Sequence, residues 1–441
     1  MHPYIPHTSD DIRKMLDTVG MKSLDDLYAD VPQEFIYKGE YDLPDAMSED
    51  EIRRFFTSLA ERNVKMTCFA GQGWYDHCTP AVIPYLTQRS EFLTAYTPYQ
   101  PEISQGTLRY IFEYQSMICA LTGLEVSNAS MYDGPTAAAE AVRMAIASTR
   151  KKDTVLISST LLPQVKEVVK TYASYAGTVI EEIAETDGQT SLDALKKALM
   201  SDRVAGVLVP NVNGYGVIED HTGYADAAYA AGALYIEYCD PSTLAVLKSP
   251  AEWGADVAVG DGQSLGIPLC YGGPTVGFMA CRKEHLRKLP GRIVGTTTDR
   301  DGKRCFVLTL QAREQHIRRD KATSNICSNQ SLMALWVTIY LSLLGPKGLT
   351  KVNERSSAAA HYLCKELLAT GRFTPVSDKP FLKEFALDYK GDARAFHKAL
   401  ADKGILAGVV IGDQRICFAV TEKRTREEID CLINCVKEAA L

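Results

Sequence analysis

The sequence lacks the features of membrane and secreted proteins. It contains no run of about 18 consecutive apolar residues, the length that a transmembrane helix needs. Its first residues, MHPYIP, show no basic region followed by an apolar stretch, so no secretion signal is expected. Its 12 cysteines are scattered without a C-x-x-C pair, which argues against a disulfide framework. These absences favour a soluble protein of the reducing cytoplasm.

Dense basic blocks and clustered metal ligands are absent as well. The formal net charge is −7, and no block rich in lysine or arginine offsets it locally, so a nucleic-acid partner is not expected. Cys431 and Cys435 lie four residues apart on a predicted helix, without histidines nearby. Two such thiols make a poor metal site, and we expect no metal.

The first 62 residues are predicted to be helical. The chain has 441 residues, 46% of them hydrophobic, which is enough for more than one domain. Ser9 can cap a helix that Gly20 ends, and Ser48 with Glu51 forms a capping box before a second helix. Residues 1–62 are therefore expected to form an N-terminal helical arm.

Residues 63–345 alternate short β-branched runs with helical stretches. Val155-Leu156-Ile157 and Val207-Leu208-Val209 are apolar throughout, as strands are when both faces of their sheet are covered. The alternation of strand and helix predicts a large α/β domain with a mostly parallel sheet.

A smaller C-terminal domain is expected to follow. A long apolar helix from Ser331 to Leu344 is predicted to end at Gly345-Pro346. Residues 346–441 then combine predicted strands with helices, the last of which opens with a capping box of Thr425 and Glu428. We expect an α+β domain.

Residues 130–136 (SMYDGPT) form a small polar turn before an alanine-rich helix. A helix N-terminus offers unpaired backbone N–H groups and the positive end of the helix dipole, which suits a phosphate. Asp133, Gly134 and Thr136 are therefore candidates for a phosphate cup. A simple helix cap, with Thr136 or Asp133 as the capping residue, explains the pattern equally well.

A second polar segment, residues 93–106, contains two prolines and a glycine that keep it irregular. It presents Tyr96, Tyr99, Gln100 and Glu102, which offer several hydrogen-bond donors and acceptors in a short loop. We interpret it as a binding loop rather than a structural corner.

Two further segments are candidates for ligand binding. Residues 313–327 place a basic cluster before the turn Thr323-Ser324-Asn325, which could bind an anion or be a solvated charged loop. Residues 256–274 form a strand and then a glycine-rich loop, at the sheet edge where α/β proteins place ligands. This loop contains no lysine.

In chain order, these segments resemble the P-protein of the glycine cleavage system, in particular subunit 1 of its split, two-chain bacterial form. The resemblance runs essentially from end to end. Its most specific pieces are YTPYQPEISQG (residues 96–106), SMYDG (130–134), GVIED (216–220), GGP (272–274) and residues 313–327.

The resemblance implies fold type I of the enzymes that depend on pyridoxal phosphate (PLP), with a large α/β domain and a smaller C-terminal domain. It implies a subunit of glycine dehydrogenase (aminomethyl-transferring), which decarboxylates glycine and passes the aminomethyl group to the lipoylated H-protein. It further implies a cytoplasmic α₂β₂ heterotetramer in which subunit 2, not this chain, holds PLP covalently through a lysine.

This chain has no lysine where the family carries it. Alignment on the motifs downstream puts Gln263 at that position, whereas alignment on Pro250 puts Ser264 there, and neither can form an imine. PLP also needs an acid on its pyridine nitrogen. Glu237 and Asp240 both remain open for that role.

We therefore expect no catalytic residue on this chain alone. As the resemblance suggests, the Tyr96–Glu102 loop and the Thr323–Asn325 turn should cross the dimer interface and line the partner's glycine and PLP site. Residues 74–80 (WYDHCTP) are a further candidate. Two alternatives are a stand-alone PLP enzyme that uses Lys283 or Lys288, and a non-catalytic scaffold with a decayed site.

Overall fold

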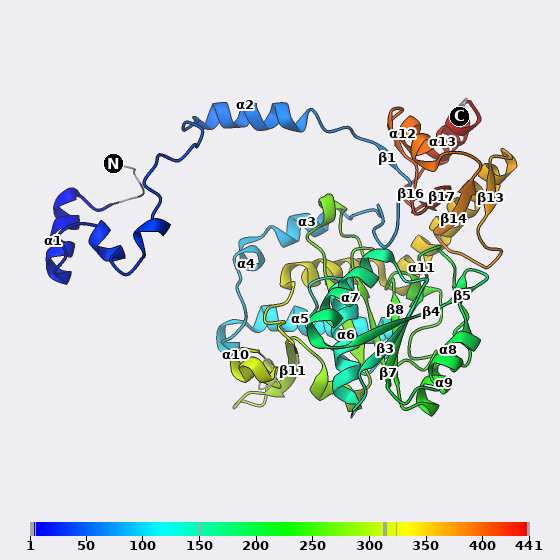
Figure 1. Ribbon diagram of the computed structural model, residues 1–441, viewed down its shortest axis with the longest axis horizontal. Helices are drawn as coiled ribbons and strands as arrows, with labels where there is room; N and C mark the ends of the chain where they lie inside the picture. Colours follow the sequence, from blue (N-terminus) through cyan, green and yellow to red (C-terminus); the bar gives the residue numbers. More distant parts are fainter. Residues whose placement is uncertain (1–3, 5, 150, 312–314, 323, 439–441) are drawn as a thin grey trace. The chain divides into compact units, whose positions relative to one another are not determined.

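The chain divides into two compact units in the computed structural model, Met1–Val64 and Lys65–Leu441 (Figure 1). The structure describes residue 4 and residues 6–149, 151–311, 315–322 and 324–438.

The first unit contains the two predicted helices, α1 (Ser9–Val19) and α2 (Glu49–Ala60). Gly20 ends α1 in the left-handed conformation, and the capping box of Ser48 and Glu51 is present, as predicted. The predicted cap Ser9 is wrong by one residue. Thr8 caps α1, because its hydroxyl accepts from the amide of Asp11 while the Asp11 carboxylate accepts from the amide of Thr8.

This unit has no interior of its own. Neither helix contains a buried residue. More than half of the exposed large apolar side chains of the described chain lie in it, including Phe55 and Phe56. All five buried hydrophobic clusters lie in the second unit.

A seven-stranded sheet forms the centre of the second unit, in the order β2–β10–β9–β8–β7–β3–β4. The strands are parallel except at β10, which is antiparallel to both of its neighbours. The mostly parallel sheet is confirmed. The bounds are β2 (Val126–Ser127), β3 (Thr154–Ser158), β4 (Val179–Ile183), β7 (Val204–Asn211), β8 (Leu234–Cys239), β9 (Val257–Asp261) and β10 (Gly277–Cys281).

Helices cover both faces of this sheet. Along β3, Val155 and Ile157 pack into the cluster that holds α6 and α7, whereas Leu156 packs into the cluster of α8 and α9. The side chains therefore alternate between two cores, as on a strand buried on both sides. The covering helices are α6 (Gly134–Ser148), α7 (Pro163–Ala176), α8 (Leu192–Ala198) and α9 (Tyr224–Ala230).

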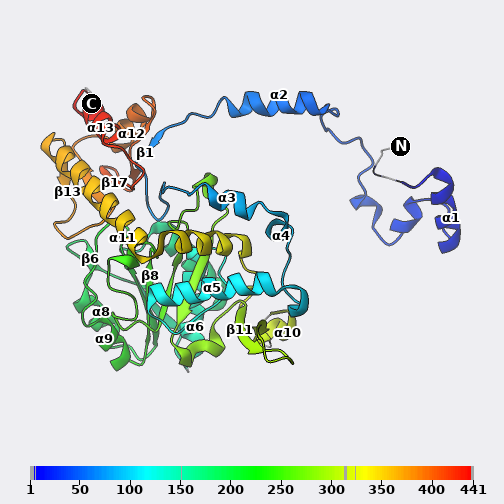
Figure 2. The ribbon, with the colours of Figure 1, turned by 180° about the vertical axis from the view of Figure 1, so that it is seen from behind.

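The long helix α11 (Ser331–Ala369) runs beside α5 (Gln105–Thr122) and continues into the C-terminal part (Figure 2). The predicted end at Gly345-Pro346 is confirmed as a break in the helix, although a second helical stretch follows it directly. Gly345 adopts a positive φ of 58°, and Pro346 begins a second helical stretch, where its missing N–H is not needed. Among the described residues, α11 is the one helix long and apolar enough to cross a membrane. Its two halves, however, supply buried side chains to two hydrophobic cores.

The C-terminal part is α+β, as predicted. A four-stranded antiparallel sheet has the order β13–β14–β17–β16. Phe69, which follows β1 (Thr67–Cys68), enters the core of this part, and β1 pairs with β15 (Ile405–Leu406). The division at residue 345 stays a prediction. The other elements are β13 (Phe373–Pro375), β14 (Glu384–Tyr389), β16 (Val409–Val410), β17 (Arg415–Ala419), α12 (Ala393–Ala401) and α13 (Arg426–Glu438).

Removal of residues 1–64 should leave the second unit folded, because every buried cluster lies outside these residues. Calorimetry should give a Tm within about 2 °C of that of the full chain. A control that begins at residue 79 also loses β1, and should unfold at least about 5 °C lower. A 1–64 deletion as unstable as the control would contradict the independence of the second unit.

Candidate functional site

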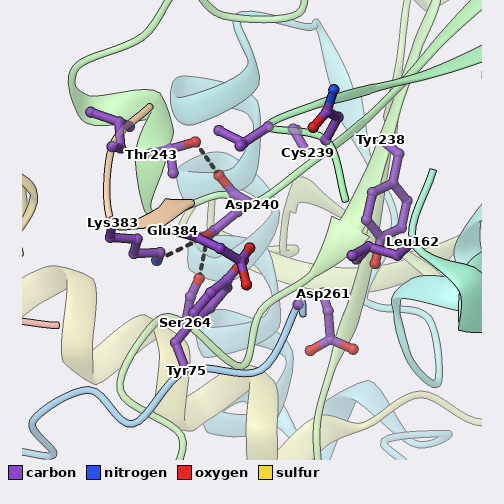
Figure 3. A pocket seen from close by; sticks show the side chains of 14 residues that line it. Tyr75, Leu162, Tyr238, Cys239, Asp240, Thr243, Asp261, Ser264, Lys383 and Glu384 are labelled. Atoms are coloured by element: carbon purple, nitrogen blue, oxygen red, sulfur yellow. Dashed lines mark hydrogen bonds and ion pairs between the residues drawn. The ribbon is translucent and has the colours of Figure 1, made fainter. Parts of the chain in front are cut away.

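A small central cavity lies at the carboxyl ends of β8 and β9, where α/β proteins bind ligands. The start of β14 and the segment after β1 form its other walls (Figure 3). Its volume is about 30 Å³, room for about two water molecules. The lining residues include Tyr75, Tyr238, Asp240, Asp261, Ser264, Lys383 and Glu384.

Asp240 follows directly after β8 and points into the central cavity (Figure 3). Its Oδ2 lies 2.7 Å from Nζ of Lys383, and its Oδ1 accepts from the hydroxyls of Ser242 and Ser264. Burial raises the pKa of Asp240, but the charge of Lys383 outweighs burial and holds that pKa below its ordinary value. The carboxylate is therefore ionised and already paired.

The other acid of β8, Glu237, does not line the central cavity. It is fully buried, and its carboxylate lies 3.4 Å from Nδ1 of His221. Burial raises the pKa of Glu237. Of the two acids left open by the sequence, the structure therefore places only Asp240 at the cavity.

Gln263 and Ser264, the two alternatives for the missing lysine, lie in the turn after β9 and are both buried. The Gln263 amide accepts from the amide of Tyr75 at 2.8 Å and donates to the carbonyls of Tyr75 and Ile267 at 2.9 and 2.7 Å. Its polar atoms are thus committed to the backbone. Ser264 is the one that faces the cavity, where its hydroxyl donates to Asp240.

Two carboxylates of the chain itself accept hydrogen bonds from backbone amides at the start of α6. Asp133 caps the helix by accepting from the amide of Thr136 at 2.7 Å. Asp261 accepts from the amide of Gly134 at 2.9 Å. Burial raises the pKa of Asp261 to about 6. The N–H groups that a phosphate would need are already occupied, and carboxylates there would repel it.

The predicted loop around Tyr96 does not line the central cavity. Tyr96 is 79% exposed, and Gln100 and Glu102 are exposed beside it. Tyr99 is anchored, because its hydroxyl accepts from the guanidinium of Arg292 at 3.1 Å. The loop therefore presents polar and aromatic groups to the outside of this chain.

Ser324 and Asn325 line a second hollow of about 410 Å³, apart from the central cavity. Glu140 of α6 lies beneath them, and burial raises its pKa to about 7 against its hydrogen bond with Ser324. Arg319 and Tyr172 form other walls. Thr323 lies outside the described residues.

A group of possible metal ligands also occurs among the described residues, Asp256, Glu284 and His285. Asp256 already accepts from the backbone amide of Tyr235 at 2.9 Å, and the guanidinium of Arg282 lies 3.6 Å from it. A positive charge so close makes this a poor cation site.

The sequence interpretation missed Lys383, which lies 3% exposed just before β14. The signal available was a Lys-Glu pair at the entry to an apolar strand, where burial of charge requires partners. It also missed Asp261. His77, which contacts Lys383, lies within the segment 74–80 that was a further candidate.

PLP does not fit the central cavity of this chain. The cofactor requires a lysine for its imine, an acid for its ring nitrogen and donors for its phosphate. Here Ser264, which cannot form an imine, faces the cavity; Lys383 is paired with Asp240, and Asp261 accepts from the amide at the start of α6. The remaining volume, about 30 Å³, is far below that of a cofactor pocket.

The sheet order, the antiparallel β10 and the C-terminal α+β part define the chain as a fold type I protein of the PLP-dependent enzymes. Alanine–glyoxylate aminotransferase from Nostoc sp. has this fold, with a TM-score of 0.62 and 17% identity over 86% of this chain and 96% of that one.

More specific matches cover the whole length. The family model for the glycine cleavage system P-protein matches residues 2–436. The probable glycine dehydrogenase (decarboxylating) subunit 1 of Moorella thermoacetica is 49% identical over 436 residues, which cover 98% of both chains. The crystal structure of an inhibitor-bound glycine decarboxylase (P-protein) has a TM-score of 0.91 and 44% identity over 99% of both chains. The chain belongs to the glycine cleavage system P-protein family.

When the chain alone is mixed with PLP and reduced with borohydride, we expect no stoichiometric label at any single lysine. The reason is that the cavity is filled and Lys383 is held by Asp240. Peptide mass spectrometry makes the measurement, with a lysine-bearing PLP subunit as the positive control. Stoichiometric label at Lys383, Lys283 or Lys288 would show that the chain binds the cofactor itself.

Asp261 should make stability depend on pH. Its pKa is about 6 in the folded chain and near 4 when unfolded, so the folded state binds more protons between these values. Stability should therefore fall as pH rises from 4 to 6, by about 2 kcal/mol relative to Asp261→Asn. Urea unfolding of both proteins gives this difference. A difference that stays constant over that range would refute the assignment.

Proposed function

We propose that this chain is the subunit of a two-subunit glycine decarboxylase that does not bind the cofactor, and that it acts only with a lysine-bearing second subunit. Together they decarboxylate glycine and transfer its aminomethyl group to the lipoylated H-protein. PLP, held covalently by the second subunit, supplies the electron sink for this reaction. The observation that carries the proposal is a central cavity of only about 30 Å³, whose Lys383 is paired with Asp240, in a chain matched over 98% of its length by subunit 1 relatives.

This chain's part in the reaction falls to residues outside its central cavity. The exposed Tyr96–Glu102 loop and the Ser324–Asn325 segment supply polar and aromatic groups to the glycine and PLP site of the partner, as does Thr323, which precedes Ser324 in the sequence and lies outside the described residues. Their anchoring supports this role. The guanidinium of Arg292 donates to the Tyr99 hydroxyl, and the Ser324 hydroxyl accepts from the amide of Ile326 at 3.0 Å, so the groups are offered from fixed positions.

The assembly follows from the same division of roles. We expect a cytoplasmic α₂β₂ heterotetramer, without nucleic acid or membrane as a partner. The stand-alone alternative lacks support, because neither Lys283 nor Lys288 lines the central cavity. Both lie in a short 3₁₀ segment that follows β10. The scaffold alternative is separated from the proposal by activity measurements.

Replacement of Tyr96 or Asn325 by alanine should lower turnover of the reconstituted complex by about tenfold or more, because small displacements of positioning groups strongly reduce rate. Assembly, followed by size-exclusion chromatography, should not change. Glycine–bicarbonate exchange after addition of subunit 2 measures the rate.

Met200→Ala is the control, since Met200 is 85% exposed at the end of α8 and belongs to neither loop. Full activity of both loop variants would contradict the role of these loops. A tight complex without exchange activity in the wild type would favour the scaffold alternative.

A further inference from the structure

Lys383 lies in a buried box of partners that matches the valence of an ammonium group. Its Nζ is 2.7 Å from Asp240 Oδ2, 3.0 Å from the Ser242 hydroxyl and 2.9 Å from His77 Nε2. The ring of Tyr75 lies beneath it, with its centroid 4.1 Å away. The ammonium thus has two hydrogen-bond partners, His77 and Ser242, and one ion-pair partner, Asp240, while a π-face covers another side.

His77 connects Lys383 to Glu422, which lies between β17 and α13. Because an ammonium only donates, His77 Nε2 accepts from Lys383, and its Nδ1 carries the proton that it donates to Glu422 at 2.6 Å. Burial and the neighbouring ammonium lower the pKa of His77, so the ring is neutral. The positive charge that faces Asp240 therefore belongs to Lys383.

We propose that Lys383 is a built-in replacement for the protonated ring nitrogen of PLP, so that the chain fills its own cofactor site. The acid after a central strand and the aromatic ring beside it are the elements that would hold a pyridinium, and here the ammonium of Lys383 lies on that acid instead. Asp261 replaces the phosphate at the start of α6 in the same manner. This inference concerns the interior of the chain and does not depend on the loops proposed to line the partner's site.

The ion pair between Lys383 and Asp240 also connects two sheets, because each residue comes from a different one. Asp240 belongs to the large sheet, whereas Lys383 and Glu384 stand at the entry to β14 of the four-stranded sheet. Glu384 adds an indirect link, since it accepts from the hydroxyl of Tyr75 at 2.8 Å, and the backbone of Tyr75 bonds the side chain of Gln263 after β9. The filled cavity therefore fastens the C-terminal sheet to the carboxyl edge of the large sheet.

The first test removes the ammonium and supplies it again. Lys383→Ala should lower the Tm by about 5 °C or more, because Asp240 is left unpaired beside a new cavity. Ethylammonium chloride at tens of millimolar should restore at least half of this loss, whereas tetramethylammonium chloride should not. The wild type and the double variant Lys383→Ala/Asp240→Asn should not respond to ethylammonium. A Tm of Lys383→Ala that is equal to the wild type, or that both salts raise equally, would overturn the proposal.

The second test keeps the side-chain volume at position 383 and removes its positive charge. If Lys383→Ala does not fold, this test alone decides whether Lys383 compensates Asp240. Lys383→Met should lower the Tm, and Lys383→Met/Asp240→Asn should recover more than half of the loss, since an uncharged pair replaces the ion pair. Losses that simply add in the double variant would show that Lys383 does not compensate Asp240. All of these measurements use the full chain without subunit 2, so their failure is distinct from failure of the proposed function.

Discussion

The ion pair between Lys383 and Asp240 is the interaction on which the interior of this chain depends. Asp240 follows a strand with parallel neighbours on both sides, so its carboxylate, which is 14% exposed, lies at the carboxyl edge of the sheet. A buried carboxylate that lacks a cation is strongly destabilising. Lys383 provides that cation from another sheet, and the packing of the C-terminal part against the central cavity follows from this need.

Under the proposed function, the same constraint explains why a chain that does not itself hold PLP keeps the architecture of enzymes that do. The fold places a strand end, a glycine-rich turn and a helix start around one cavity, and each brings polar groups that cannot remain unpaired. Ser264, Asp261 and Lys383 pair those groups internally. The architecture then serves to hold external features, such as the anchored loop at Tyr99 and the Ser324–Asn325 turn, in fixed positions.

Local patterns predicted the fold well, because they depend on neighbours in the sequence. Apolar runs such as Val207–Val209 are buried strands, and the capping box at Ser48 is present. The break at Gly345-Pro346 is present as well, but local patterns did not predict that a second helical stretch follows it directly and extends α11 to Ala369. The filling of the cavity could not be predicted in this way. Lys383 and Asp240 are far apart in the sequence, and only the tertiary structure brings them together.

Loss of PLP binding and gain of the internal charges are coupled by electrostatics. An ammonium at Lys383 would repel a protonated ring nitrogen, and a carboxylate at Asp261 would repel a phosphate, so neither is compatible with bound PLP. Conversely, a cavity without PLP and without Lys383 would leave Asp240 unpaired in the interior. A chain of this fold therefore either binds the cofactor or supplies the charges itself. Because this chain supplies them, its core is complete without PLP, and its exposed loops remain free to contribute to a site in another subunit.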